Sequence, residues 1–390
     1  MPIADNILEQ LDLNKERLFA DLEKFVKIES PSTEPEQIAK AYQFLIDQFS
    51  GIDYYTLWVP GQNTGGYLYA RPKNRRKFAR VQLLIGHADT VWPVGSINEM
   101  PVELENDKIK GPGVYDMKAG LIQIIYAIKT LKSLNITPEV EPIVLINSDE
   151  EIGSKESTSI IRYLSKLADR VFILEPSFGS EGKLKTRRVG VGKYIIKIKG
   201  KSAHAGLDPG KGASAIVELS HVIQTLFLLN DAEKRISVNV GMIDGGIRPN
   251  VIAAESSAVV DVRVPTLEVG VRIDKEIKQL KPVNKDVELY IEGGIGRPPM
   301  EGTPANRALW ELAKLSGNKL NIHLMEATAG GGSDGNTTSE YTGTLDGLGA
   351  VGDGAHAKHE FAYQSKIIER TALLCLLILA EPATTQAHEL

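Results

Sequence analysis

The sequence lacks what several classes of protein require. Its one cysteine, Cys375, has no partner for an internal disulfide and lies in the apolar stretch 373–380, where we expect a buried, unreactive thiol. That stretch is much shorter than the roughly 20 apolar residues that cross a bilayer. The net charge of −5 provides no general attraction to nucleic acid or to an anionic membrane. We therefore expect neither kind of partner.

The first ten residues are acidic and lack the basic-then-apolar pattern of an export signal. This absence predicts a cytoplasmic protein. A periplasmic location stays open if the sequence is a shortened form.

The chain is long enough for two hydrophobic cores, with 390 residues of which 42% are hydrophobic. Short apolar runs at 81–85, 143–146 and 171–174 predict strands. Apolar residues at helical spacing predict helices at 8–28, 33–49, 119–134, 305–315 and 366–380. Continuous apolar strands separated by helices are typical of a largely parallel sheet that is buried on both faces. The fold class is therefore α/β.

The middle of the chain has a different pattern. It predicts half-exposed strands and helices in the order β-α-β-β-α-β, at 190–199, 212–229, 237–243, 256–264, 269–280 and 287–291. This order is that of a ferredoxin-like α+β module. We therefore expect an inserted domain at 188–295, between two parts of a catalytic domain at 1–187 and 296–390.

Each of the three apolar runs of the first part is followed by side chains that can bind a metal. These are His87 and Asp89 after the first, Glu150 and Glu151 after the second, and Glu175 after the third, with Asp116 in the loop before the 119–134 helix. The carboxyl ends of parallel strands meet at one edge of a sheet, where α/β proteins bind ligands. Carboxylates that converge there repel one another unless a cation neutralises them.

The types of ligand suggest the metal. Imidazole together with carboxylate suits zinc or a related first-row ion such as cobalt or manganese. The expected ligand set has two imidazoles and three carboxylates: His87, His356, Asp116, Glu151 and Glu175. Two divalent ions and one hydroxide would balance the three negative charges, whereas one ion would leave the site anionic. We therefore expect two metal ions.

Neighbouring residues are expected to support these ligands. Asp89 lies two residues after His87, so it can accept the second imidazole N–H and orient the ring. Glu150 and Glu151 are adjacent and should diverge. We expect Glu151 to bind metal and Glu150 to act as the general base toward the attacking water.

Several motifs together resemble the M20 metallopeptidase family. They are His-Ala-Asp-Thr-Val at 87–91, Gly-Pro-Gly-Val-Tyr-Asp-Met-Lys at 111–118, Asp-Glu-Glu-Ile-Gly-Ser at 149–154, Glu-Pro-Ser at 175–177, Ser-Ala-His-Ala-Gly at 202–206 and Gly-Asp-Gly-Ala-His at 352–356. The resemblance covers most of the chain from His87 onward. It implies a zinc-exopeptidase-type catalytic domain with an inserted dimerisation (lid) domain, and hence a homodimer.

By this resemblance Asp116 bridges the metals, His87 and Glu175 hold one ion, Glu151 and His356 hold the other, and Glu150 is the base. The peptide bond between Asp116 and Met117 is then expected to be cis. His359 stands where many relatives have asparagine, so it competes with His356 for the ligand role.

Within the family, the sequence is most similar to glutamate carboxypeptidases of the carboxypeptidase G2 type. The similarity lies in Glu-Pro-Ser with the later Gly-Lys-Leu, Arg-Pro-Asn-Val-Ile, Asp-Val-Arg, Gly-Arg-Pro and Thr-Ala-Gly-Gly-Gly-Ser-Asp. It implies that Lys183, Arg263 and Arg297 hold substrate carboxylates. It also implies that His204 and Asn250 reach across a dimer to polarise the scissile carbonyl. The backbone at Gly331 and Gly332 is a further candidate to cradle a carboxylate.

The predicted function is a zinc-dependent carboxypeptidase that releases a C-terminal amino acid, glutamate by the resemblance, from small peptides or N-acyl amino acids. An N-acyl amino-acid deacylase or a dipeptidase of the same family would differ only in the pocket. A non-catalytic, metal-dependent binding protein is an alternative of another class, although it would have no use for Glu150 as a base. His221, His323 and His388 have no motif around them, and we expect them to be structural or exposed.

Overall fold

The computed structural model describes residues 3–381 and divides the chain into two compact units. The larger unit comprises Met1–Thr186, Gly302–Thr328 and Ser333–Leu390, and the inserted unit comprises Arg187–Glu301 and Ala329–Gly332. The boundary predicted between residues 295 and 296 falls inside a strand, β12 (Glu288–Arg297). The chain also returns to the inserted unit for four residues, which the sequence pattern did not predict.

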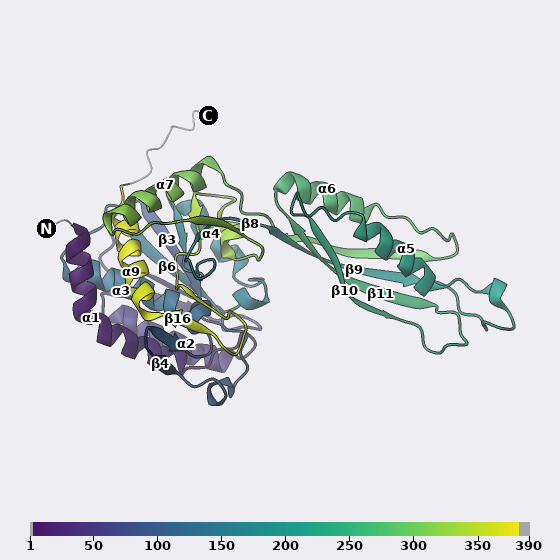
Figure 1. Ribbon diagram of the computed structural model, residues 1–390, viewed down its shortest axis with the longest axis horizontal. Helices are drawn as coiled ribbons and strands as arrows, with labels where there is room; N and C mark the ends of the chain where they lie inside the picture. The colour runs from purple at the N-terminus through teal and green to yellow at the C-terminus, as the bar shows by residue number, and fades with distance from the viewer. Residues whose placement is uncertain (1–2, 382–390) are drawn as a thin grey trace. The chain divides into compact units, whose positions relative to one another are not determined.

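A six-stranded sheet forms the centre of the larger unit (Figure 1). Its strands are, in spatial order, β1 (Tyr54–Val59), β2 (Tyr67–Pro72), β6 (Glu141–Asn147), β3 (Val81–His87), β7 (Val171–Ile173) and β14 (Thr344–Leu345). β6, β3, β7 and β14 run parallel, whereas β2 pairs antiparallel with both β1 and β6. The largely parallel sheet is confirmed. Strands β1 and β2, of which only β2 runs opposite to the rest, were not predicted.

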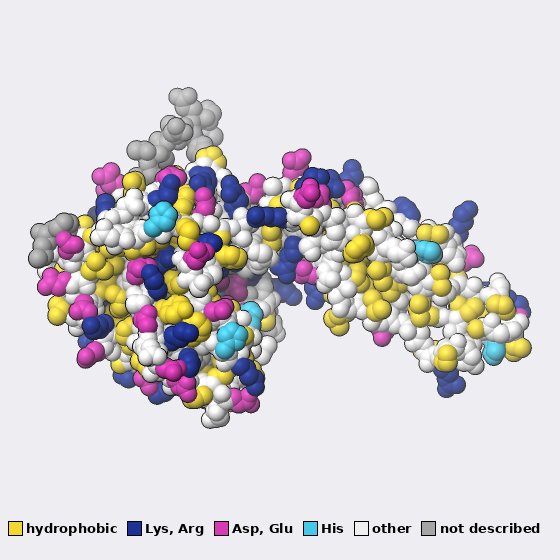
Figure 2. Space-filling model, viewed as in Figure 1, with side chains coloured by type: hydrophobic (Ala, Val, Ile, Leu, Met, Phe, Trp, Pro, Cys, Tyr) yellow, Lys and Arg dark blue, Asp and Glu magenta, His cyan; other side chains and the backbone are white. Residues whose placement is uncertain are grey.

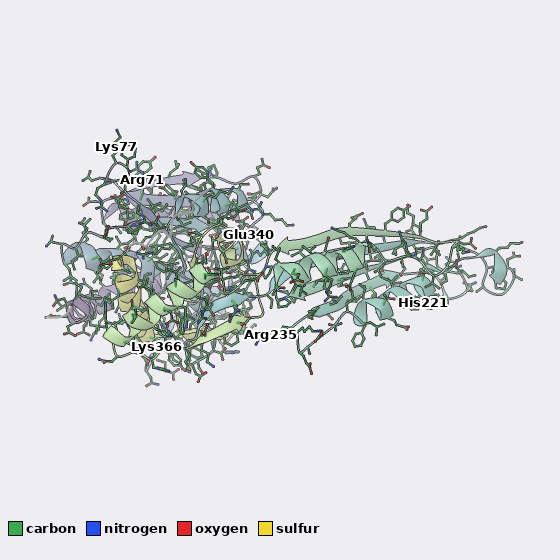
Figure 3. All side chains as sticks on the ribbon, turned by 90° about the horizontal axis from the view of Figure 1, so that it is seen from above. Arg71, Lys77, His221, Arg235, Glu340 and Lys366 are labelled. Carbon is green, nitrogen blue, oxygen red and sulfur yellow. The ribbon has the colours of Figure 1, made fainter. Side chains whose placement is uncertain are left out.

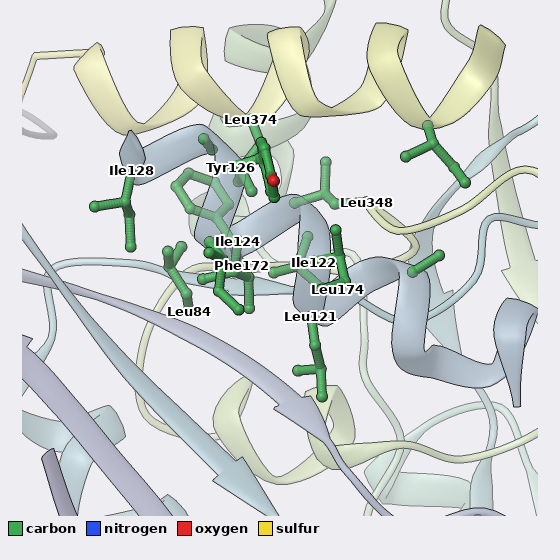
Figure 4. Packing of buried hydrophobic residues seen from close by; sticks show 14 of the residues in the cluster. Leu84, Leu121, Ile122, Ile124, Tyr126, Ile128, Phe172, Leu174, Leu348 and Leu374 are labelled. Carbon is green, nitrogen blue, oxygen red and sulfur yellow. The ribbon is translucent and has the colours of Figure 1, made fainter. Parts of the chain in front are cut away.

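Both faces of the sheet are covered, which explains why its central strands are buried throughout and mostly apolar. The helices of this unit are α1 (Ile3–Val26), α2 (Pro35–Ser50), α3 (Ala119–Ser133), α4 (Thr158–Leu167), α7 (Pro304–Lys319), α8 (Asp334–Thr338) and α9 (Gln364–Leu379). Leu84 of β3 packs into the core that α1, α3 and α9 share (Figure 4). Its neighbours Leu83 and Ile85 point to the other face, into a second core with α4. Successive strand residues face opposite sides, so each side needs its own apolar set.

Two smaller sheets lie in the segments that connect the elements of the larger unit. One has the order β15 (Gly352–Asp353), β16 (Phe361–Tyr363), β5 (Lys108–Lys110) and β4 (Glu103–Glu105). The other pairs β13 (Glu326–Ala329) with β8 (Leu184–Arg188), the strand along which the chain passes into the inserted unit.

The inserted unit has the predicted β-α-β-β-α-β order. Its elements are β9 (Gly190–Lys199), α5 (Ala215–Phe227), β10 (Ser237–Gly245), β11 (Glu255–Val264), α6 (Leu267–Lys278) and β12. The antiparallel sheet has the order β10-β11-β9-β12, which leaves β10 and β12 as edges. Along β9, Tyr194, Ile196 and Ile198 are buried, and the residues that alternate with them are exposed lysines or, at Ile195, half-buried, as expected of a sheet with one covered face. Within residues 3–381, no helix is both long and apolar enough for a membrane span.

Candidate metal centre

The central sheet positions the first group of polar residues. His87 is the last residue of β3, Glu150 and Glu151 form a short turn after β6, and Glu175 follows β7 by two residues. These strands are parallel neighbours, so their carboxyl ends lie at the same edge. The convergence expected from the strand pattern is therefore present.

Asp116 reaches the same edge from the loop before α3. Gly113 has φ +72°, and a Cβ there would lie 2.4 Å from the Thr90 side chain, so only glycine fits. The amide of Lys118 closes the loop by donating to the Gly113 carbonyl at 2.9 Å. The Asp116–Met117 peptide bond is cis, as predicted.

The carboxylate of Asp116 lies between the two histidines. Its Oδ1 is 3.2 Å from His87 Nε2, and its Oδ2 is 3.7 Å from His356 Nε2. On the first side, Glu175 Oε1 is 3.4 Å from His87 Nε2. On the second side, Glu151 Oε2 is 3.1 Å from His356 Nε2. One carboxylate with a histidine and a glutamate on each side offers donor groups for a pair of metal ions.

Two groups of potential ligands share His87. In one, single donor atoms of His87, Asp116 and Glu151 lie within 4.8 Å of one another, and in the other the same holds for His87, Glu150 and Glu175. Glu150 and Glu151 therefore divide between the two groups, whereas only Glu151 was expected to bind a metal. Glu150 lies close enough to His87 and Glu175 to be a ligand as well as a base.

Asp89 holds both the histidine and the turn after β6. It is fully buried, and His87 Nδ1 lies 3.3 Å from its carboxylate and 2.9 Å from its carbonyl oxygen. A proton on Nδ1 leaves Nε2 of His87 free to bind a metal. The amide of Glu151 donates to Asp89 at 3.1 Å, so this carboxylate also orients the turn.

The ionisation of these groups reflects their crowding. Burial opposes protonation of His87, but hydrogen bonds to Asp116, Asp89 and Glu175 hold its pKa well above the ordinary value. Burial raises the pKa of Glu151 to about 7, against the hydrogen bond from His356. That hydrogen bond with Glu151 is the main reason why the pKa of His356 rises to about 9. The pKa shifts of all three groups favour protonation, so the centre attracts positive charge.

A buried oxygen without a hydrogen-bond partner also indicates that this centre can bind a cation. Glu151 Oε1 is buried and has no hydrogen-bond partner. A carboxylate oxygen in this position costs free energy unless a cation binds it. The donor groups around it are the imidazole and carboxylate types that zinc prefers.

The histidine beside Glu151 is His356, not its competitor His359. His356 has φ +61°, which is uncommon for a residue other than glycine, and its side chain is half exposed. His359 instead lines a cavity of about 400 Å³ next to Asp116.

Two residues at this centre were missed. Glu360 is buried and accepts hydrogen bonds from three backbone amides of the Asp116 loop. Lys185 of β8 is also buried, lines the same cavity, and has its Nζ 3.9 Å from Glu175 Oε2. The predicted Lys183 pairs with Glu181 at 2.5 Å and does not line this cavity.

The other predicted substrate residues belong to the inserted unit. His204 and Asn250 are exposed and adjacent, since the amide of Ala205 donates to the Asn250 carbonyl at 3.0 Å. Arg263 is engaged by Asp261, with nitrogen–oxygen distances of 2.8 and 2.9 Å. Gly332 lies against Arg297, because a Cβ at this position would be 3.3 Å from Arg297 Cδ. Gly331 precedes it in the same four-residue return, and its carbonyl accepts from Arg188 at 3.1 Å.

The remaining histidines are exposed where the structure describes them. His221 lies on α5 of the inserted unit (Figure 3), and His323 lies in the larger unit. His388 lies outside the described residues.

Comparison with known proteins identifies the family. The family model described as peptidase family M20/M25/M40 matches residues 83–380. Carboxypeptidase G2 of Pseudomonas sp. (strain RS-16) is 29% identical over 393 residues, covering 96% of this chain and 92% of that protein.

Solved structures share the fold. Aminopeptidase PepT from Bacillus cereus has a TM-score of 0.79 at 21% identity, covering 94% of this chain and 98% of that chain. The YXEP protein of Bacillus subtilis, described as a dinuclear metal binding peptidase from the M20 family, has a TM-score of 0.70 at 14% identity, with the same coverage. The chain belongs to peptidase family M20/M25/M40 and is a metallopeptidase.

Proposed function

We propose that this metallopeptidase is a two-metal carboxypeptidase that releases a C-terminal amino acid, glutamate in its preferred substrate, from peptides or N-acyl amino acids. The observation that carries the two-metal site is the position of Asp116 between His87 and His356, with one glutamate beside each histidine. The preference for glutamate is supported by the 29% identity to Carboxypeptidase G2 and by the motifs shared with glutamate carboxypeptidases.

His87, Glu175, Asp116, Glu151 and His356 would hold the ions, which we propose to be zinc. Bound there, two divalent ions would supply Lewis acidity that lowers the pKa of the attacking water and polarises the scissile carbonyl. Cobalt or manganese would suit the same donors. Asp89 keeps His87 in the tautomer that presents Nε2.

The remaining steps fall to Glu150 and His204. Glu150 accepts the proton of the attacking water and returns it to the leaving nitrogen, so that one carboxylate serves as base and then as acid. His204 donates a hydrogen bond to the oxyanion that develops on the carbonyl. Arg263 and Arg297 remain candidates for the substrate carboxylates, and Lys185 is a cation already beside the ligand Glu175.

A matched pair of substrates tests this function. Zinc-loaded protein should hydrolyse an N-acyl-glutamate and a dipeptide ending in glutamate, and should leave the corresponding α-carboxamides intact, because the free carboxylate anchors the substrate. A panel that varies the C-terminal residue and the acyl group separates the carboxypeptidase from a deacylase or a dipeptidase. Equal cleavage of the carboxamides would exclude a carboxypeptidase.

We also propose a homodimer that forms through the inserted unit. β10 is an edge strand whose Met242 and Ile243 are both 68% exposed. On α5, Phe227 is 71% exposed, and Figure 2 displays hydrophobic side chains over this part of the inserted unit. An exposed edge strand with an apolar neighbouring surface offers two-fold pairing. In such a dimer, His204 and Asn250 would serve the site of the neighbouring subunit.

Mixing two inactive variants tests the shared site. His204→Ala and Glu150→Gln should each lose turnover and retain metal. Mixed dimers should regain activity, because one of their two sites has both groups intact. Exchange of subunits is demonstrated with two differently tagged chains. If exchange occurs without recovered activity, His204 does not act across the dimer.

A further inference from the structure

Glu360 is a buried carboxylate near the metal centre whose two oxygens are both fully hydrogen-bonded. Its Oε1 accepts from the amides of Tyr115 and Asp116 at 2.9 and 3.0 Å. Its Oε2 accepts from the amide of Gly113 at 2.9 Å and from the indole of Trp92 at 2.8 Å. The side chain is 1% exposed, so these four donors take the place of water.

The loop that carries Asp116 depends on these contacts. The amides of Gly113, Tyr115 and Asp116 lie at the start of the helical segment Val114–Lys118, where the first amides have no acceptor within the helix. Asp116 itself has the non-helical angles φ −116° and ψ 98°. A charged acceptor makes hydrogen bonds roughly twice as strong as a neutral one does. One of these bonds ends on the amide of Asp116 itself, the residue whose carboxylate lies between the two histidines.

The same turn of chain carries a ligand and this acceptor. The amide of Ala357 donates to Gly354 at 2.8 Å, and the amide of Glu360 donates to Ala357 at 3.0 Å, so residues 354–360 form one bonded turn around His356. A Cβ at Gly354 would lie 2.8 Å from Glu360 Cα, which shows how closely this turn is packed. Glu360 therefore links the segment of His356 to the loop of Asp116.

A purely structural role is the alternative, and the chain contains a comparison for it. Glu218 is likewise 1% exposed and accepts from the amides of Val283 and Asn284 at 2.7 and 2.9 Å, in the inserted unit. Glu218 stabilises a loop that carries none of the proposed metal ligands. Loss of either carboxylate should lower stability, but of the two only Glu360 bonds to a residue of the proposed metal site.

We propose that Glu360 is a positioning residue for the two-metal site, because its hydrogen bonds fix the backbone of Asp116 relative to the turn that carries His356. This inference rests on the proposed function. A Glu360→Gln substitution probes it with little change of shape. The NH₂ group of the new amide would face N–H donors and cannot accept from them, so some of the hydrogen bonds that fix the Asp116 loop are lost.

The test compares the metal affinities of three folded proteins. Apo forms of the wild type, Glu360→Gln and Glu218→Gln are titrated with zinc, and bound zinc per chain is measured after dialysis. We expect Glu360→Gln to bind zinc about 10- to 100-fold more weakly. This is the loss of affinity that follows when a group that orients a metal ligand is removed. The more weakly bound of the two ions should be affected most. Glu218→Gln should bind two ions with the affinity of the wild type.

The melting temperature separates positioning from stability. Zinc should raise the melting temperature of the wild type and of Glu218→Gln by similar amounts, and that of Glu360→Gln by less, whatever the starting stability of each apo protein. If Glu360→Gln does not fold, Glu360→Asp keeps the charge but withdraws it by one methylene, and the same loss of affinity is expected.

Two results would overturn the inference. Wild-type affinity and stoichiometry in Glu360→Gln or Glu360→Asp would reduce Glu360 to a structural residue while the proposed function stands. A wild type that binds no zinc or related ion would remove the metal site itself, and with it both proposals.

Discussion

Replacing Glu150 with glutamine is expected to lower kcat by about 100-fold or more while two metal ions stay bound, because a general base contributes about 10²–10⁴ in rate. Glutamine has the same shape but cannot take a proton from water at neutral pH. The measurements are kcat with an N-acyl-glutamate and zinc per chain in the same sample.

The structure makes this experiment decisive, because it leaves two roles for Glu150. A donor atom of Glu150 lies within 4.8 Å of those of His87 and Glu175, which is compatible with binding a metal as well as with taking a proton. If Glu150→Gln loses an ion along with activity, Glu150 is a ligand. If it keeps both ions and near wild-type activity, Glu150 is neither a ligand nor the base.

The neighbouring Glu156 provides the control. It belongs to the same segment after β6, and its carboxylate accepts from the amides of Gln62 and Asn63 at 3.1 and 2.8 Å. It lies in neither group of potential ligands. Glu156→Gln should therefore keep both the metals and kcat.

The convergence of the candidate ligands was predictable because their positions follow from the sheet. His87 and Glu175 come at the ends of strands that are apolar on both faces, and parallel strands bring such ends together whatever the remaining structure does. The inserted unit was predictable for a similar reason. Apolar and polar residues alternate along β9 because one face of its sheet is covered, as the burial of Tyr194 and the exposure of Lys193 show.

Glu360 was not predictable in this way. Its backbone partners lie 244 to 247 residues earlier in the chain, and no periodic pattern links such distant positions. Lys185 was missed because the Gly-Lys-Leu motif favoured Lys183. Lys183 follows the turn at Gly182 (φ +68°) and lies outside any strand, whereas Lys185 lies within β8, which begins at Leu184. Strands β1 and β2 carried a usable signal, because their aromatic residues favour strands.

Replacing Asp116 with asparagine is expected to have the largest effect on the metal site. Each carboxylate oxygen of Asp116 faces a different histidine, at 3.2 Å from His87 and 3.7 Å from His356. Asparagine keeps the shape, but only its carbonyl oxygen can bind a cation, and one negative charge is lost. Zinc per chain should fall from two to one or fewer.

Activity should fall with the metal. Lewis acidity contributes several kcal/mol to catalysis, and each factor of ten in rate corresponds to about 1.36 kcal/mol, so we expect kcat to fall by about 1000-fold. Asp274→Asn is the matched control, since this aspartate accepts from Tyr194 at 2.8 Å within the inserted unit and should affect neither quantity. If Asp116→Asn retained two ions and near wild-type kcat, Asp116 would not be the bridge, and the two histidines would belong to separate sites.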